Sequence, residues 1–396
     1  MPASDPIVVV GAARTPIGGF LGVLKEASAP ALGATTIRAA LKRAGLDGGR
    51  IDEALMGCVL AAGLGQAPAR QAALAAGLSV SVGATTVNKM CGSGMKAAML
   101  ACDLIAAGSA DIVVAGGMES MSNAPYLLER ARSGYRMGHG RIVDHMFLDG
   151  LEDAYDKGRL MGTFAEDCAE AYQFTREAQD AYALRSLGRA QAAMRDGAFA
   201  AEIAPVMVKA AKSETIVADD EQPPKAAPDK IPTLKPAFRD GGTVTAANSS
   251  SISDGAAALV LMRESEAERR GIAPLARIVG HATYAAQPKD FPTAPIGAIR
   301  RLCDKTGWKA GAVDLYEINE AFAVVAMAAM RDLDLPADRV NVNGGACALG
   351  HPIGASGARI LVTLIAALKA RGLRRGVAAL CIGGGEGTAM AVERAG

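Results

Sequence analysis

The chain has 396 residues, half of them hydrophobic, with 46 glycines but only 8 Phe, 7 Tyr and 1 Trp. This length favours two or three domains, and the composition predicts a large α/β core built from aliphatic side chains. The 42 basic and 41 acidic residues give a net charge of +1 and form no basic stripe, which argues against nucleic acid and membrane surfaces as partners.

The sequence lacks a membrane-spanning run and an export signal, which together predict a cytoplasmic protein. The longest apolar runs, residues 321–330 and 360–368, are far shorter than the ~20 residues that cross a bilayer. The N-terminus carries Ser4 and Asp5 and continues directly into a strand-like run, without the basic and long apolar parts of an export signal.

The first 120 residues alternate short apolar runs with helical patterns. We expect strands at 7–10, 54–60 and 112–115, and helices at 31–44 and 95–107 that end at glycines. Strands separated by helices predict a mostly parallel sheet with helices on its faces.

Residues 119–244 change character. They contain a polar helical stretch at 176–195 and a connection rich in Pro and Lys at 222–236, which are typical of an inserted cap rather than a third core. The core pattern returns at 256–262.

The last third repeats the pattern of the first. Residues 87–117 contain Val87-Asn88, a glycine-rich turn, a helix, a glycine, a strand and a glycine pair, and residues 342–385 contain the same order from Val342-Asn343. We therefore predict two similar halves. The expected domains are 1–120 plus 252–273, the inserted cap 121–251, and 274–396.

The seven cysteines form an odd set with no CxxC pair, which argues against a disulfide framework and a structural zinc site. They are Cys58, Cys91, Cys102, Cys168, Cys303, Cys347 and Cys381. Most are expected to be reduced thiols. Their surroundings predict buried packing for Cys58, Cys102, Cys168 and Cys303.

The strongest local motif is Asn88-Lys89-Met90-Cys91-Gly92-Ser93-Gly94. It places Cys91 at the entry of a helix, where unpaired N–H groups and the helix dipole favour a thiolate. Cys91 is the candidate nucleophile, and a buried turn cysteine is the alternative. The same letters fit a dinucleotide pattern, but the strand before them, residues 85–90, is too polar for that fold.

A cysteine nucleophile needs a base, and His351 is the candidate among four histidines because it lies in a comparable glycine-rich turn. His139, His145 and His281 are expected to be structural or exposed. Cys381 ends a strand before Gly383-Gly384-Gly385, at a carboxyl end where reactive groups gather in α/β sheets.

Asn319, in Asn319-Glu320-Ala321-Phe322, follows a strand-like run and is expected to open a helix, most simply as its N-cap.

Together these motifs resemble the thiolase family over essentially the whole chain. The resembling segments are CGSG at Cys91, NEAF at Asn319, GHPIGASGAR from Gly350 and CIGGG at Cys381. The resemblance implies a duplicated thiolase fold, layered α/β/α/β/α, with an inserted loop or cap domain. It is closest to bacterial acetyltransferases that act on acetyl-CoA, and it implies tight homodimers or homotetramers.

The implied reaction joins two acetyl-CoA molecules into acetoacetyl-CoA and CoA, and also runs in reverse as thiolysis. Cys91 would carry the acyl group, His351 would activate it, and Cys381 would act as acid and base at the α-carbon. Oxyanion holes would use His351 with a water on Asn319, and the backbone N–H groups of Cys91 and Gly383. The implied CoA-binding positions are Met161, Ala246, Ser250 and Phe322. No metal or cofactor is implied, since the CoA thioesters are substrates.

Some positions depart from the family pattern. Leu160 stands where close relatives often have a histidine, Glu386 stands where Met or Gln is usual, and Cys347 is an extra thiol that we expect to be structural. Three alternatives remain at this point: a thiolase for longer 3-ketoacyl chains in fatty acid metabolism, an inactive acyl-CoA binding protein, and a decarboxylating condensing enzyme. The last would pair its cysteine with two histidines.

Overall fold

The computed structural model describes residues 5–210 and 213–395. Ser4 and the outermost residues of the first and last expected domains lie outside these ranges. The helices are α1 (Ala29–Ala44), α2 (Pro68–Ala75), α3 (Ser93–Ala106), α4 (Met161–Ala171), α5 (Arg176–Arg195), α6 (Gln222–Lys225), α7 (Glu264–Arg269), α8 (Ala294–Thr306), α9 (Ala323–Asp332), α10 (Ala346–Leu349) and α11 (Ser356–Ala370).

The strands alternate with these helices along the chain. They are β1 (Ile7–Arg14), β2 (Gly18–Gly19), β3 (Glu53–Gly57), β4 (Gly83–Val87), β5 (Ile112–Ser120), β6 (Tyr126–Leu127), β7 (Val143–Asp144), β8 (Val206–Ala210), β9 (Ser213–Val217), β10 (Ser253–Arg263), β11 (Ala276–Ala285), β12 (Leu315–Ile318), β13 (Arg375–Ile382) and β14 (Glu386–Arg394).

The main sheet is mixed, so the expectation of a mostly parallel sheet is wrong. Its strand order is β12-β13-β14-β11-β1-β10-β5-β3-β4, with β2 paired to β10. Among the described strands, its parallel pairs lie near the two ends, between β12 and β13 and on both sides of β3. The centre is antiparallel: β10 runs opposite to β1 and β5, and β14 turns back directly on β13 through a tight turn at Gly384 and Gly385 with φ of 93° and 88°.

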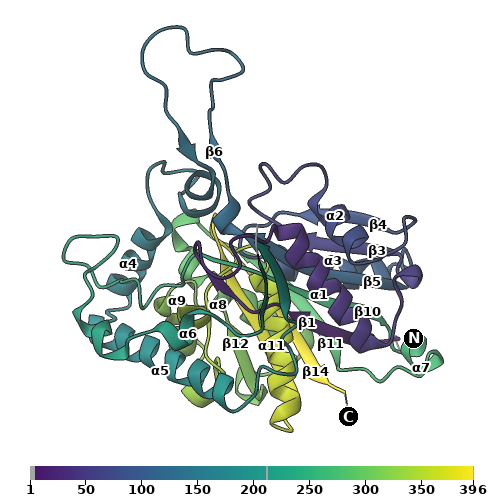
Figure 1. Cartoon of the computed structure of the whole chain (residues 1–396). Coiled ribbons are helices and arrows are strands. Elements are labelled where there is room, and N and C mark those ends of the chain that lie inside the picture. Colours follow the sequence, from purple (N-terminus) through teal and green to yellow (C-terminus); the bar gives the residue numbers. More distant parts are fainter. Residues whose placement is uncertain (1–4, 211–212, 396) are drawn as a thin grey trace.

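The helices form layers around this sheet, which confirms the expected α/β/α/β/α arrangement. Helices α1 and α2 pack on one half of the sheet, α8 and α9 pack on the other, and α3 and α11 lie between the halves. In Figure 1, α11 runs through the middle of the molecule.

Helices α3 and α11 approach most closely at their N-termini. A Cβ built on Gly94 would lie 2.9 Å from the amide nitrogen of Ala358, and one on Gly357 would lie 2.4 Å from that of Met95. Only glycine fits such a contact without displacing backbone. The two glycine-rich motifs of the sequence therefore meet at the junction of the halves.

Most predicted elements are confirmed, with small shifts at their ends. The helix that begins at Ala29 ends at Gly45, whose φ is 67° as a left-handed cap requires. The strand expected at 54–60 ends at Gly57, because the N–H groups of Val59 and Leu60 bond to the buried carboxylate of Glu119 instead of a neighbouring strand.

One local expectation is wrong. Asn319 does not cap a helix, since α9 begins only at Ala323 after Phe322. The two repeated units also differ at their start: Val87 ends strand β4, whereas Val342-Asn343 forms no strand, because the preceding Asn341 has φ of 50° and its side chain bonds to both backbone groups of Ile318.

Residues 121–251 leave the sheet at the end of β5 and return to it at β10, where Ser120 and Asp254 are direct neighbours. They include α4, α5 and an arm built on the short β6–β7 pair, which projects from the body in Figure 1. The expected domain boundaries stay a prediction. None of the helices in the described part of the chain is both long and apolar enough to span a bilayer.

Candidate active site

The turn before α3 fixes Cys91 through local contacts. Ser93 is the first residue of the helix; its hydroxyl accepts from the amide of Lys89 at 2.9 Å and donates to the carbonyl of Met90 at 2.6 Å. Met90 has φ of 47°, an uncommon conformation for a side chain of this size. Such backbone strain is typical of functional sites, and here it places Cys91 at the helix entry.

The Cys91 thiol keeps its proton, contrary to the expectation that the helix end favours a thiolate. Burial raises its pKa to about 11, more than the N–H groups of Gly383 and of Cys91 itself lower it, and the charge of Glu119 raises it further. Desolvation disfavours a charged group more than a helix end favours it here. The resting nucleophile is therefore a neutral thiol.

Cys381 lies beside Cys91, although the two belong to different halves. It is fully buried near the end of β13, and its pKa is raised by burial first and by the neighbouring Cys91 second. Ile382 packs on Gly92, where an added Cβ would lie 2.4 Å from its Cδ1. The end of β13 and the turn after it therefore present Cys381 and the N–H of Gly383 to Cys91.

His351 is buried and its tautomer follows from its contacts. Ser356 donates its hydroxyl proton to the carbonyl of Pro352 at 2.9 Å, and its oxygen lies 2.5 Å from Nδ1 of His351. That oxygen must accept, so we assign the ring proton to Nδ1. Nε2 then carries a free lone pair, and among the described residues it is buried with no hydrogen-bond partner.

The imidazole is neutral at physiological pH. Burial lowers the pKa of His351 to about 3, and the positive charge of Arg359 lowers it as well. A neutral imidazole with a free Nε2 is the state that can accept a proton from a thiol. Ile353, two residues later, packs in the same apolar cluster as Cys91.

Asn319 adjoins this imidazole. Its amide nitrogen lies 3.5 Å from Nδ1 of His351, and Arg359 donates to its carbonyl oxygen at 3.5 Å. Its backbone N–H donates to Ala379 of β13 at 2.9 Å. The structure therefore brings Asn319 and His351 together, and places Cys91, Cys381 and Gly383 together, while the chemical roles of all five stay predictions.

The four expected CoA-binding positions border this region to different degrees. Met161 begins α4 with its sulfur 3.6 Å from where a Cβ of Gly383 would lie. Ser250 donates to the carbonyl of Ala321, next to Phe322, through its amide at 3.0 Å and its hydroxyl at 2.9 Å. Ala246 is exposed, and none of the described contacts joins it to the other three.

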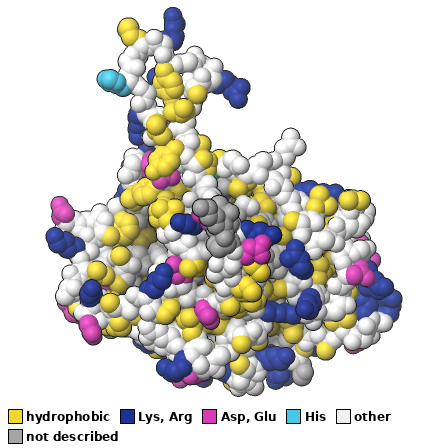
Figure 2. All heavy atoms as spheres, in the orientation of Figure 1, with side chains coloured by type: hydrophobic (Ala, Val, Ile, Leu, Met, Phe, Trp, Pro, Cys, Tyr) yellow, Lys and Arg dark blue, Asp and Glu magenta, His cyan; other side chains and the backbone are white. Residues whose placement is uncertain are grey.

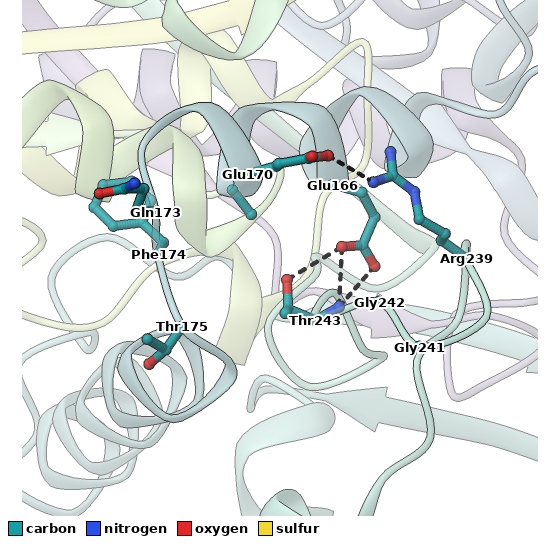
Figure 3. A pocket seen from close by; sticks show the side chains of 10 residues that line it. Glu166, Glu170, Gln173, Phe174, Thr175, Arg239, Gly241, Gly242 and Thr243 are labelled. Carbon is teal, nitrogen blue, oxygen red and sulfur yellow. Dashed lines mark hydrogen bonds and ion pairs between the residues drawn. The ribbon is translucent and has the colours of Figure 1, made fainter.

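A separate cavity lies at α4 and the loop that precedes Val244. Its volume is about 500 Å³, and none of the predicted catalytic residues lines it. Glu166 at its wall accepts the amides of Thr243 and Val244 at 2.9 to 3.0 Å, and Arg239 reaches Glu170 at 3.1 Å (Figure 3). These contacts satisfy the polar groups within the protein, so we assign this cavity no chemistry.

The remaining histidines and Cys347 take no part in the site. His139 is exposed, His145 pairs with Asp149 at 2.7 Å and His281 with Asp103 at 3.1 Å. The Cys347 sulfur lies 3.8 Å from the carbonyl of Glu320. No cluster of three or more metal-ligating side chains occurs within residues 5–210 and 213–395, and the absence of a metal from the reaction stays a prediction.

Three polar residues at this junction were missed by the sequence reasoning. Ser356 sets the tautomer of His351. Glu320 accepts from Tyr182 and Ser186 of α5 at 2.9 and 2.8 Å and from Asn341 at 2.8 Å, which ties the inserted segment to the C-terminal half. Glu119 is described below. Its only sequence signal is an acidic residue that directly follows Gly116-Gly117-Met118 at a strand end.

Comparison with known proteins agrees with this arrangement. The family model described as "Thiolase, N-terminal domain" matches residues 7–265, and "Thiolase, C-terminal domain" matches 272–394. An acetyl-CoA acetyltransferase of Pseudomonas aeruginosa is 49% identical over 98% of this chain and 99% of its own length.

Two solved structures have the same fold. The acetyl-CoA acetyltransferase of Bacillus anthracis has a TM-score of 0.96 and 43% identity, over 99% of both chains. A thiolase of Ascaris suum in complex with coenzyme A has a TM-score of 0.93 and 41% identity, over 98% of this chain and all of that one.

Proposed function

The chain belongs to the thiolase family, and from that premise we propose that it is an acetyl-CoA C-acetyltransferase. It joins two acetyl-CoA molecules into acetoacetyl-CoA and CoA, and catalyses the reverse thiolysis. The observation that carries the proposal is the meeting of Cys91 with Cys381 and the Gly383 N–H across the junction of the two halves. A neutral His351 lies two residues before Ile353, which packs in the same apolar cluster as Cys91. The similarity to acetyl-CoA acetyltransferases over nearly the full length supports the substrate.

In the first half-reaction, Nε2 of His351 takes the proton of Cys91 as the sulfur attacks the acetyl carbonyl. The developing oxyanion lies between the N–H groups of Cys91 and Gly383, which already point at this thiol. Collapse breaks the bond to CoA and leaves acetyl-Cys91. The departing CoA thiolate takes the proton of Cys381, which thereby becomes a thiolate.

In the second half-reaction, the Cys381 thiolate removes a proton from the α-carbon of another acetyl-CoA. The resulting carbanion attacks acetyl-Cys91 and forms the new carbon–carbon bond. The Cys91 thiolate leaves and recovers its proton from His351. The Cys381 proton thus leaves with CoA and is replaced by the α-carbon proton, so every protein group ends the cycle in its starting protonation state. The cycle as proposed uses no metal, redox partner or further cofactor.

A thiolase for longer 3-ketoacyl chains is the second candidate. Leu160 supports it, since this apolar side chain directly precedes Met161, one of the expected CoA-binding positions. An inactive acyl-CoA binding protein is disfavoured because Cys91, Asn319, His351 and Cys381 are all present. The decarboxylating alternative is disfavoured because a thiol, Cys381, stands beside the nucleophile.

The test is a thiolysis assay with 3-ketoacyl-CoA substrates of increasing chain length, run before and after dialysis against a chelator. We expect the highest kcat/KM for acetoacetyl-CoA and no effect of the chelator. A maximum at longer chains favours the second candidate, and no turnover of any substrate contradicts the enzymatic function.

We also propose a cytoplasmic homodimer or homotetramer. The seven cysteines are free, which fits a reducing compartment. The projecting arm exposes Leu128, Met137 and Ile142 by 53%, 98% and 69%. Figure 2 shows apolar side chains mixed with basic ones on this arm. Exposed apolar surface of this kind is typical of subunit contacts. Sedimentation measurements test the assembly.

A further inference from the structure

Glu119 is a charged residue buried at the junction of the two halves that the proposed reaction does not use. It lies near the carboxyl end of β5 and its exposed fraction is 0%. A buried carboxylate is costly unless its oxygens are fully satisfied. The contacts of this side chain should therefore reveal what it holds.

The carboxylate accepts three backbone amides from two distant segments. Val59 and Leu60, in the loop after β3, each donate at 3.0 Å, and Gly354 donates at 2.8 Å. The thiol of Cys58 lies 3.8 Å from the same group. None of the ion pairs within the described ranges includes Glu119, so backbone N–H dipoles take the place of a cation.

The contact with Gly354 joins the two halves next to the catalytic base. Gly354 follows His351 by three residues and lies 235 residues from Glu119 along the chain. This inference rests on the proposed function. We propose that Glu119 is a positioning residue for the thiolase reaction, because its carboxylate fixes the segment that carries His351 against the half that carries Cys91.

The fit around this segment is close enough to transmit a displacement. A Cβ on Gly354 would lie 2.6 Å from the Glu119 carboxylate and 3.0 Å from Cα of Cys58. A Cβ on Gly117 or Gly57 would lie 2.1 or 2.6 Å from the carbonyl of Gly354. The carboxylate therefore holds the segment at a fixed distance from β3 and β5.

Glu119 also acts on the nucleophile electrostatically. The titratable groups that face it are the thiols of Cys58 and Cys91, while the His351 segment offers it a backbone N–H. Its charge raises the pKa of Cys91, and burial raises its own pKa to about 7. The ionised carboxylate thus favours the neutral thiol that a general base requires.

The experiment compares Glu119→Gln with two control variants in the full-length enzyme. Gln keeps the size of the side chain but removes its charge. Its amide NH₂ group cannot accept the backbone N–H groups that the Glu119 carboxylate accepts. Glu166→Gln is the matched control, since Glu166 is also buried and accepts backbone amides, yet lies away from Cys91. Gly354→Ala disturbs the same contact from the other side and keeps the charge.

Thiolysis of acetoacetyl-CoA and alkylation of Cys91 by iodoacetamide are measured against pH, after circular dichroism confirms folding. We expect kcat of Glu119→Gln and of Gly354→Ala to fall roughly 10²-fold with KM within about threefold, as a misplaced catalytic group would cause. Only Glu119→Gln should shift the alkylation profile to lower pH. Glu166→Gln should leave alkylation unchanged.

Wild-type kcat in folded Glu119→Gln overturns the proposal, and so does an equal loss of kcat in Glu166→Gln. If Glu119→Gln does not fold, Gly354→Ala is compared with Gly188→Ala, where an added Cβ meets nothing within 4 Å; equal kcat in these two also overturns it. Absence of thiolysis in the wild type would instead contradict the proposed function.

Discussion

The turns before α3 and α11 each end at a serine, and the two serines make different contacts. Ser93 and Ser356 are each the first residue of their helix, and each donates its hydroxyl proton to a carbonyl of the preceding turn. The oxygen of Ser93 then accepts a backbone amide, that of Lys89, whereas the oxygen of Ser356 accepts from the side chain of His351. Ser93 therefore holds the backbone of its turn, and Ser356 orients the side chain of His351.

This difference shows how each reactive group is placed. Cys91 is positioned by contacts within a few residues, in a turn that ends at Ser93. His351 depends additionally on distant groups, namely Asn319 and the contact of Glu119 with Gly354. The nucleophile is therefore a local feature of the sequence, and the position of the base is a property of the whole fold.

The largest effect is expected from removing the locally placed group. Cys91→Ala should abolish acylation by acetyl-CoA and lower thiolysis by at least about 10⁴-fold, since covalent catalysis is lost while the fold is kept. Intact mass spectrometry after incubation with acetyl-CoA measures the adduct. An acyl adduct that persists in this variant, or that maps to Cys347 or Cys381, would contradict the assignment.

Cys381→Ser tests the thiol that the other half brings to Cys91. A hydroxyl is a far weaker acid and base, so condensation should fall by roughly 10²- to 10⁴-fold or more. Acylation of Cys91 should fall less, because a departing CoA thiolate can take its proton from water. Exchange of the acetyl protons of acetyl-CoA in deuterated water isolates the α-carbon step. Exchange at the wild-type rate means that Cys381 is not the base.

Features that depend on local contacts could be predicted from the sequence, whereas those that depend on distant contacts mostly could not. The helix ended by Gly45, the helix after Cys91 and the strand that carries Cys381 follow from local propensity and glycine punctuation. The meeting of Cys91 with Cys381 was indicated by the rule that reactive groups gather at the carboxyl ends of strands, and the family resemblance made it specific, because no local pattern places residues from two halves side by side.

Other features could not be predicted from the sequence. The antiparallel return of β10 to the sheet centre depends on pairings across more than a hundred residues. The neutral thiol of Cys91 results from desolvation, which outweighs the helix-end effect that the motif suggests. Glu119 gave only a weak signal, because its three N–H partners come from segments far away in the chain.

Ser356→Ala should have an intermediate effect, because it removes the acceptor that keeps the ring proton on Nδ1 of His351. Loss of a group that fixes a histidine tautomer typically costs about 10- to 100-fold in activity. We expect this loss in kcat for thiolysis with little change in KM. Ser28→Ala, which removes the side-chain cap of α1, is the control and should lower the unfolding temperature while leaving kcat of the folded enzyme unchanged. Equal kcat losses in the two variants would mean that the loss at Ser356 reflects destabilisation and not the tautomer of His351.

The smallest effect is expected from the ion pair between the turn before α3 and the first residue of β14. Lys89 precedes Cys91 by two residues, and its ammonium lies 2.5 Å from the carboxylate of Glu386, which follows Gly383 by three. Glu386 is one of the departures from the family pattern, and this contact accounts for the side chain. The Lys89 and Glu386 side chains are 20% and 33% exposed, so water and salt screen their attraction.

Such partly exposed pairs contribute about 0 to 1 kcal/mol, because the Coulomb gain is offset by desolvation and the ordering of two side chains. A double-mutant cycle of Lys89→Met and Glu386→Met should therefore give a coupling below about 1 kcal/mol in the free energy of unfolding. The coupling should decrease further at high salt, and kcat for thiolysis should change by less than about threefold, since the Ser93 contacts still hold the turn that bears Cys91. The pair Lys209 and Glu214, on the β8–β9 hairpin and 75% and 58% exposed, is the matched control and should show no measurable coupling. A coupling well above this range at Lys89 and Glu386, together with a tenfold loss of kcat, would mean that the turn bearing Cys91 depends on a contact from the other half as strongly as the turn bearing His351 does.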